Sequence, residues 1–205
     1  MMTAEKNSTI SKLDYTRYLQ NGIDYGKYKQ QMGEDLLSNT DEKIKGYIRL
    51  NQSRMQRVEK TFSVSPAIAQ QVKNLKHKTW WLILPEHWCG DAAQTLPVLN
   101  KIAEISEGKI VMKLVYRDEN VELMDRFLTT RTRSIPKLIQ LDEDLNITGS
   151  WGPRPLVAQQ LVKQLRSDTT QEGHYGHELH LWYAKDKQQS IEQEILELLL
   201  DGAQS

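Results

Sequence analysis

The chain has 205 residues, of which 27 are basic and 27 acidic, so its formal net charge is zero. A neutral chain creates no long-range field toward nucleic acid or an anionic membrane, and we expect neither as a partner. The sequence has one cysteine, Cys89, which excludes an internal disulfide and is typical of a reducing compartment. Residues 1–12 lack the apolar core of a signal peptide, and no stretch approaches the roughly 20 apolar residues that span a bilayer. These features predict a soluble, cytoplasmic protein.

The pattern of residues 1–76 predicts a helical extension. Apolar residues over 13–23 are spaced as on an amphipathic helix, and Asn39 or Thr40 is expected to cap a second helix. Ser65, followed by a proline, has the features of a third helix start. We expect the three helices to pack on one face or edge of a sheet, without a role in catalysis. The apolar residues of the second helix follow the 3.6-residue period: Ile44, Tyr47, Ile48, Met55 and Val58.

The centre of the chain is a strand followed by a thiol and a helix. Residues 79–84 form a short, apolar, aromatic-rich run that predicts a buried strand, and helical spacing begins after Cys89 and continues to Gly108. A thiol at this junction faces the free N–H groups of the helix, which predicts a lowered pKa and a reactive Cys89. The carboxylate of Asp91, in the first turn, acts on the thiol in the opposite direction. A buried structural cysteine is the alternative, because free cysteines usually pack as small hydrophobes.

Strand and helix patterns alternate through the rest of the chain, as in a mixed α/β sheet. In chain order they predict a strand at 110–115, a helix around 121–128, strands at 136–141 and 147–151, a helix over 156–165, a short segment at 179–183 and a last helix capped by Ser190.

Histidines occur at two places of interest. His174, His177 and His180 recur every three residues, but on a regular helix the third is rotated by about 120° from the first. No thiol or carboxylate completes a metal-ligand signature, so we expect a solvated segment, no metal and no cofactor. His87, two residues before Cys89, is a minor candidate for stabilising a thiolate.

Residues 78 to about 166 resemble the thioredoxin family. Trp88-Cys89-Gly90 matches the start of the family's WCGPC motif, and Pro97 stands where the family has the proline that kinks its active-site helix. The segment 133–138 is similar to the family's cis-proline segment. The resemblance implies an α/β thioredoxin-like fold with a central mixed sheet flanked by helices. It also implies a cis bond between Ile135 and Pro136, beside Cys89, with the backbone of Ile135 pairing with an extended substrate.

Two positions depart from the family pattern. Ala92 stands where the family has its second, resolving cysteine, and Ile83 stands where it has a buried acidic residue. The chain therefore lacks the intramolecular dithiol cycle and is similar to monothiol glutaredoxins and to single-cysteine thioredoxin-like proteins of bacteria. The resemblance predicts a monothiol thiol-disulfide oxidoreductase whose partner is a disulfide-containing protein or a low-molecular-weight thiol. An external thiol, either a low-molecular-weight thiol or the substrate's own second cysteine, would resolve the intermediate. The alternative is a non-catalytic binding module that has lost redox turnover.

The expected site and domain boundaries follow from the same resemblance. Cys89 is the expected catalytic residue. We expect a helical extension over 1–76 packed on the sheet, and a thioredoxin-like domain over 77–205 with a C-terminal helical tail. Trp151 and Arg154 are weaker candidates to flank the groove, since an aromatic residue at a strand end more often packs at a core edge. The expected substrate-binding residues are Trp88, Gly90, Asp91, Ala92, Ile135 and Pro136.

Overall fold

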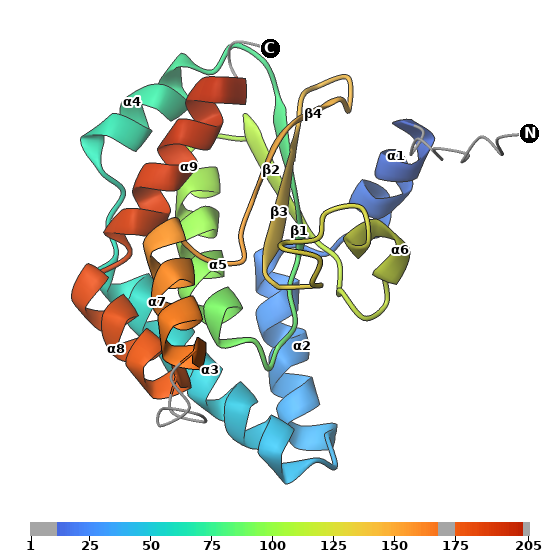
Figure 1. The fold of residues 1–205 in the computed structure, drawn as a ribbon. Helices are drawn as coiled ribbons and strands as arrows, with labels where there is room; N and C mark the ends of the chain where they lie inside the picture. The colour runs from blue at the N-terminus through green and yellow to red at the C-terminus, as the bar shows by residue number, and fades with distance from the viewer. Residues whose placement is uncertain (1–11, 168–174, 203–205) are drawn as a thin grey trace, which may run out of the picture.

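The computed structural model describes residues 12–167 and 175–202, and Figure 1 shows helices gathered around a small central sheet. The elements in chain order are α1 (Lys12–Asn21), α2 (Tyr25–Ser38), α3 (Glu42–Thr61), α4 (Pro66–Asn74), β1 (Thr79–Leu84), α5 (Gly90–Ile105), β2 (Ile110–Leu114), α6 (Val121–Met124), β3 (Lys137–Leu141), β4 (Ile147–Trp151), α7 (Leu156–Ser167), α8 (Tyr175–Asp186) and α9 (Gln189–Gly202).

The sheet has four strands in the order β2-β1-β3-β4. β1 runs parallel to β2 and antiparallel to β3, and β3 pairs antiparallel with β4. Trp81 of β1 lies opposite Met112 on one side and Gln140 on the other. The last four residues of β1 are fully buried, which explains its continuous apolar run. The expected mixed sheet is confirmed.

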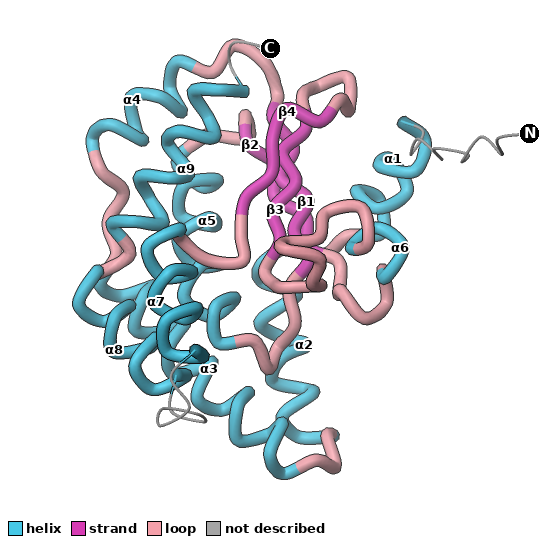
Figure 2. Tube along the Cα trace, viewed as in Figure 1, coloured by secondary structure: helices cyan, strands magenta, loops and turns pink. Residues whose placement is uncertain are grey.

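The helices form layers on both sides of the sheet. Figures 1 and 2 show α4, α5, α7, α8 and α9 on one side of the strands and α1 and α6 on the other. α5 packs on β2 and along α3, and α9 packs on β4. Buried side chains of the N-terminal helices, such as Tyr28, Met32 and Ile48, join the sheet residues in one continuous core. The domain boundary near residue 76 stays a prediction.

The N-terminal helices begin and end at residues different from those expected. α1 ends at Asn21, and Ile23 leaves the helix to exchange two backbone hydrogen bonds of 2.9 Å with Leu114 of β2. α2, which was not predicted as a separate helix, follows directly. Asp41, and not Asn39 or Thr40, caps α3, because its carboxylate accepts hydrogen bonds from two N–H groups of the first turn.

The C-terminal part matches the expected order with changed lengths. Both strands of the predicted hairpin form, as β3 and β4, whereas the helix predicted around 121–128 is only the four residues of α6. The short segment predicted at 179–183 is part of the 12-residue helix α8. Ser190 lies inside α9 and does not cap it, because its N–H and hydroxyl donate to Asp186.

Across the described ranges 12–167 and 175–202, none of the helices combines the length and the apolar character needed to cross a bilayer.

Candidate functional site

Three loops meet at one edge of the sheet because of the strand register. Leu84, the last residue of β1, lies opposite Lys137, the first residue of β3. Leu138 in turn lies opposite Trp151, the last residue of β4. The loops after β1, before β3 and after β4 are therefore neighbours. They bring together Cys89, Ile135, Pro136 and Arg154.

Cys89 lies at the start of α5 and faces the loop before β3. It is the N-cap residue of the helix, and its Sγ accepts a hydrogen bond of 3.5 Å from the N–H of Ala92. The thiol donates to the carbonyl oxygen of Ile135 at 3.3 Å. The bond between Ile135 and Pro136 is cis, as the family resemblance implied. The thiol therefore contacts the backbone that precedes the cis proline.

The pKa of Cys89 is raised, which contradicts the lowered pKa expected from the helix N-terminus. Burial of the side chain, only 7% exposed, is the largest cause, and the carboxylate of Asp91 acts in the same direction. Hydrogen bonds from the N–H groups of Ala92 and Asp91 and the charge of Arg154 act against these effects, and the pKa is about 12. Loss of water around the thiol therefore outweighs the helix N-terminus.

Asp91 is part of a buried polar cluster. Its carboxylate accepts hydrogen bonds from Arg154 Nη2 at 2.5 Å and from Arg154 Nε at 3.1 Å. The hydroxyl of Tyr183, from α8, donates to the same carboxylate at 2.7 Å. Asp91 is only 7% exposed. Its carboxylate is therefore held by the protein at the wall of the cleft, and its contact with a substrate stays a prediction.

The other predicted contact residues differ in their access to the cleft. Trp88, Gly90 and Ile135 line a cleft beside the thiol, whereas Pro136 does not. Ala92 is fully buried, so its methyl group does not reach a substrate, and Ile83 is equally buried.

α8 covers the start of α5, and no pattern in the sequence predicts this contact. A β-carbon built on Gly90 would lie 2.6 Å from His180 Nε2, so the imidazole rests directly against this glycine. His177 lies at the cleft with His180, and His174 lies outside the described residues. Within 12–167 and 175–202, no cluster of His, Cys, Asp or Glu is arranged to hold a metal.

His87 faces away from the thiol. Its Nδ1 lies 2.9 Å from the carboxylate of Asp35 in α2, and its Nε2 lies 2.8 Å from the hydroxyl of Tyr116. Burial lowers its pKa, although Asp35 acts in the opposite direction. His87 therefore fixes the loop after β1 to α2, and its expected role beside the thiolate is not supported.

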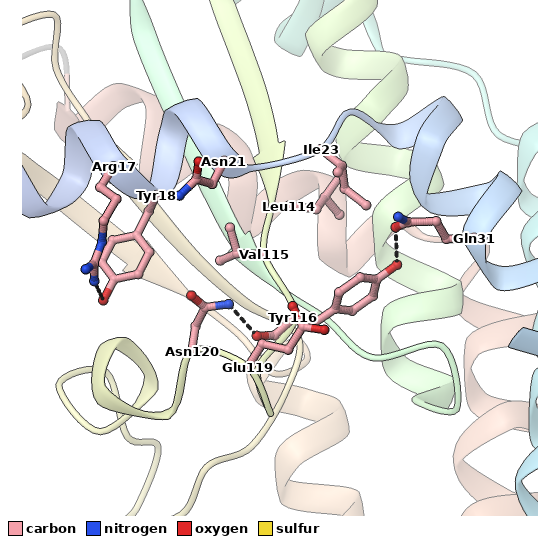
Figure 3. A pocket seen from close by; sticks show the side chains of 10 residues that line it. All are labelled: Arg17, Tyr18, Asn21, Ile23, Gln31, Leu114, Val115, Tyr116, Glu119 and Asn120. Atoms are coloured by element: carbon pink, nitrogen blue, oxygen red, sulfur yellow. Dashed lines mark hydrogen bonds between the residues drawn. The ribbon is translucent and has the colours of Figure 1, made fainter. Parts of the chain in front are cut away.

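A separate pocket lies beside β2, between α1, α2 and the loop before α6, and contains no residue of the thiol site (Figure 3). Tyr116 forms hydrogen bonds across this pocket with its side chain and its backbone. Its hydroxyl donates to Gln31 at 2.9 Å, and its backbone carbonyl accepts from the side chain of Asn120 at 2.8 Å. Because Tyr116 also contacts His87, the pocket wall supports the loop that leads to Cys89.

Of the two arginines at the site, the sequence predicts Arg154 as a weaker candidate and does not predict Arg54. Arg154 follows a recognisable Gly-Pro break after β4. Trp151, the other weaker candidate, donates its indole N–H to Glu194 and belongs to the core edge. Arg54, on α3, lines the cleft beside Gly90. Its position on a polar helix face carried no signal in the sequence.

A mixed four-stranded sheet, with a thiol at a helix N-terminus against a cis-proline loop, defines a protein of the thioredoxin fold. The thioredoxin family pattern matches residues 38–166, which is more than half of the chain. The chain therefore belongs to the thioredoxin family.

Two solved structures share the fold. A protein of unknown function from Pseudomonas aeruginosa, PA1234, is 18% identical, with a TM-score of 0.61 over 90% of this chain and 96% of that chain. An HIV epitope-scaffold is 17% identical, with a TM-score of 0.59 over the same shares of the two chains. No curated protein matches the chain significantly. Both likenesses concern the fold alone.

Proposed function

We propose that the chain is a single-thiol member of the family that forms a mixed disulfide through Cys89, which an external thiol then resolves. The observation that carries the proposal is the contact of the Cys89 thiol with the carbonyl of Ile135, at the wall of an open cleft. A disulfide that enters this cleft meets the sulfur and the backbone before the cis proline together. Ala92 is consistent with an external resolving thiol, because no second cysteine exists.

The raised pKa sets the expected speed of this reaction. With a pKa of about 12, the thiolate fraction at pH 7 is on the order of 10⁻⁵, against about 3% for a free thiol. A more basic thiolate is also more nucleophilic, with a Brønsted coefficient of about 0.5, which recovers roughly half of that loss on a logarithmic scale. We therefore expect exchange to be much slower than at a free thiol.

The test is incubation of the native protein with an oxidised small thiol. We expect a one-to-one adduct at Cys89, seen by mass spectrometry and reversed by excess reduced thiol. Cys89→Ser is the control and should give no adduct. Ala92→Cys should restore the C-x-x-C spacing and release the adduct as an internal disulfide, since residue 92 lies in the first turn of α5.

A non-catalytic binding module is the second candidate, and the burial of Cys89 favours it. If the adduct forms only after denaturation, the thiol is structural and the exchange function is wrong. In that case the cleft is a binding surface without redox turnover.

A further inference from the structure

We propose that the cleft beside Cys89 selects disulfides that carry carboxylates, and that Arg54 is the residue that receives the carboxylate. The expected substrate is a small acidic disulfide. This inference rests on the proposed exchange at Cys89 and adds the chemistry of the substrate that the cleft accepts.

The cleft has the size and the charge of a site for a small anion. Its volume is about 900 Å³, within the range typical of small-molecule sites. Half-buried and exposed apolar groups at its rim, including Trp88, Tyr47 and Leu50, offer contact for the uncharged part of a ligand. Among the residues that the structure describes, Asp91 is the only acidic one in its lining, and Arg154 already neutralises it. Its basic residues are Arg54, Arg117, Arg133, Arg154, His177 and His180.

Arg54 is the guanidinium of the cleft that remains available. Arg117 pairs with Asp118 at 2.7 Å, and Arg133 pairs with Asp125 at 2.6 Å. Within the part of the chain that the structure describes, no carboxylate lies at ion-pair distance from Arg54, which donates only to the neutral side chain of Asn51 at 2.8 Å. Its guanidinium is half-buried, so a carboxylate would meet a charge that water screens less than on the open surface.

The position of Arg54 places this charge beside the thiol. A β-carbon built on Gly90, the residue after Cys89, would lie 3.2 Å from Arg54 Nη1. A carboxylate bound to the guanidinium would therefore lie close to the start of α5. In the proposed complex, one carboxylate-bearing arm of a short disulfide spans from the guanidinium to the sulfur.

His180 supplies a neutral donor at the same wall. The side-chain amide nitrogen of Gln94, which can only donate, lies 3.4 Å from His180 Nδ1, so the imidazole proton is on Nε2, beside Gly90. Burial lowers the pKa of His180 to about 4, the charges of Arg54, Arg57 and Arg154 lower it in addition, and Asp91 acts in the opposite direction. Because Arg154 is paired with Asp91, the positive charge at this wall of the cleft comes mainly from Arg54 and Arg57.

The exchange step is balanced without a further oxidant. The Cys89 thiolate attacks one sulfur of the bound disulfide, a new S–S bond forms, and the original S–S bond breaks. The released thiolate takes up the proton that Cys89 lost. Cys89 is oxidised and the released half of the substrate is reduced.

The experiment compares three disulfides of similar size and different charge: 3,3′-dithiodipropionate, bis(2-hydroxyethyl) disulfide and cystamine. The rate of adduct formation with native protein is divided by the rate with the same protein unfolded in urea, which removes differences in leaving group. We expect the normalised rate to be at least tenfold higher for the dianion than for the dication at low salt. The ratio should fall as salt is added.

The matched variants are Arg54→Gln and Arg49→Gln, which remove the same charge from the same helix. Arg49 is exposed and does not line the cleft. We expect Arg54→Gln to reduce the charge preference by at least threefold and Arg49→Gln to leave it unchanged. Equal normalised rates for the three disulfides, or equal effects of the two variants, would overturn the proposal.

Binding without chemistry separates this proposal from the exchange function. 3,3′-Thiodipropionate has the same carboxylates but no disulfide, and its binding to Cys89→Ser is measured by calorimetry. Binding that Arg54→Gln weakens several-fold supports the acidic site even if no adduct forms in the native protein. Adduct formation without any charge preference, together with no binding of the thioether, retains the exchange function and rejects the acidic substrate.

Discussion

The guanidinium of Arg154 and the carboxylate of Asp91 form a buried ion pair with hydrogen bonds from both Nε and Nη2. The pair joins the first turn of α5 to the loop after β4, and Tyr183 of α8 donates a further hydrogen bond to the same carboxylate. Three segments that are distant in the sequence are thus fixed around Cys89. The two residues act in opposite directions on the pKa of the Cys89 thiol: Asp91 raises it and Arg154 lowers it.

Arg154→Met should destabilise the protein by about 3 kcal/mol, because it leaves the buried Asp91 carboxylate without its cation. The free energy of unfolding, measured in urea, tests this. Arg126→Met is the control, since Arg126 contacts the exposed Glu122 at 3.6 Å and its loss should cost less than about 1 kcal/mol. Equal losses for the two variants would show that the buried pair contributes no more than an exposed one.

Asp91→Asn should lower the pKa of Cys89, because it removes the carboxylate that opposes the thiolate and leaves Arg154 in place. Iodoacetamide should then label the native thiol several-fold faster at pH 8, since the lower nucleophilicity of the thiolate offsets only part of the gain in thiolate fraction. Glu122→Gln, on α6, is the control and should not change the rate. An unchanged labelling rate for Asp91→Asn, in a variant that circular dichroism shows to be folded, would mean that burial alone protects the thiol.

The sequence predicted the parts of the fold that depend on local patterns. The strand before Cys89 and the helix after it follow from local patterns, the cis bond before Pro136 follows from the family resemblance, and all three form. The state of the thiol depends instead on contacts across the fold. His180 and Tyr183 contact α5 although they lie about 90 residues further along the sequence. No periodic pattern in the sequence predicts these contacts. The expectation of a lowered pKa weighed the helix N-terminus against Asp91 but not the burial of the thiol, which is the largest cause of the raised pKa.

Glu86→Gln should remove a pH dependence of stability. Burial, the largest cause, raises the pKa of Glu86 to about 7, although the N–H of Asp118 donates to it at 2.9 Å. In the unfolded chain the carboxyl titrates near 4.5, so between about pH 4.5 and 7 the folded state binds more protons and stability falls as pH rises.

The measurement for Glu86 is urea unfolding at pH 5 and pH 8. Because the side chain is only partly buried, we expect the wild-type protein to lose about 1 to 2 kcal/mol more than Glu86→Gln over this interval. Glu122→Gln serves as the control on an exposed carboxyl and should keep the wild-type slope. A wild-type slope that survives in Glu86→Gln would assign the pH dependence to other groups.

Gly90→Ala should destabilise the contact between α5 and α8. The added methyl group would lie 2.6 Å from His180 Nε2 and 2.8 Å from His180 Cε1, too close for the ring to stay in place. Without a clash, alanine in a helix is favoured over glycine by up to about 1 kcal/mol. A loss of stability therefore indicates the clash with His180, and a gain indicates the backbone preference alone. We expect a net loss of about 1 to 2 kcal/mol in the free energy of unfolding.

The double variant Gly90→Ala/His180→Ala tests whether the clash is the cause. Removal of the imidazole makes room for the methyl group, so the loss caused by Gly90→Ala should disappear in the His180→Ala background. The coupling free energy from this double-mutant cycle should exceed about 1 kcal/mol, as for residues in direct contact. Gly46→Ala is the control on α3, because a β-carbon there meets nothing within 4 Å, and it should be neutral or stabilising. Strictly additive effects at positions 90 and 180 would mean that α8 does not rest on the start of α5 in solution.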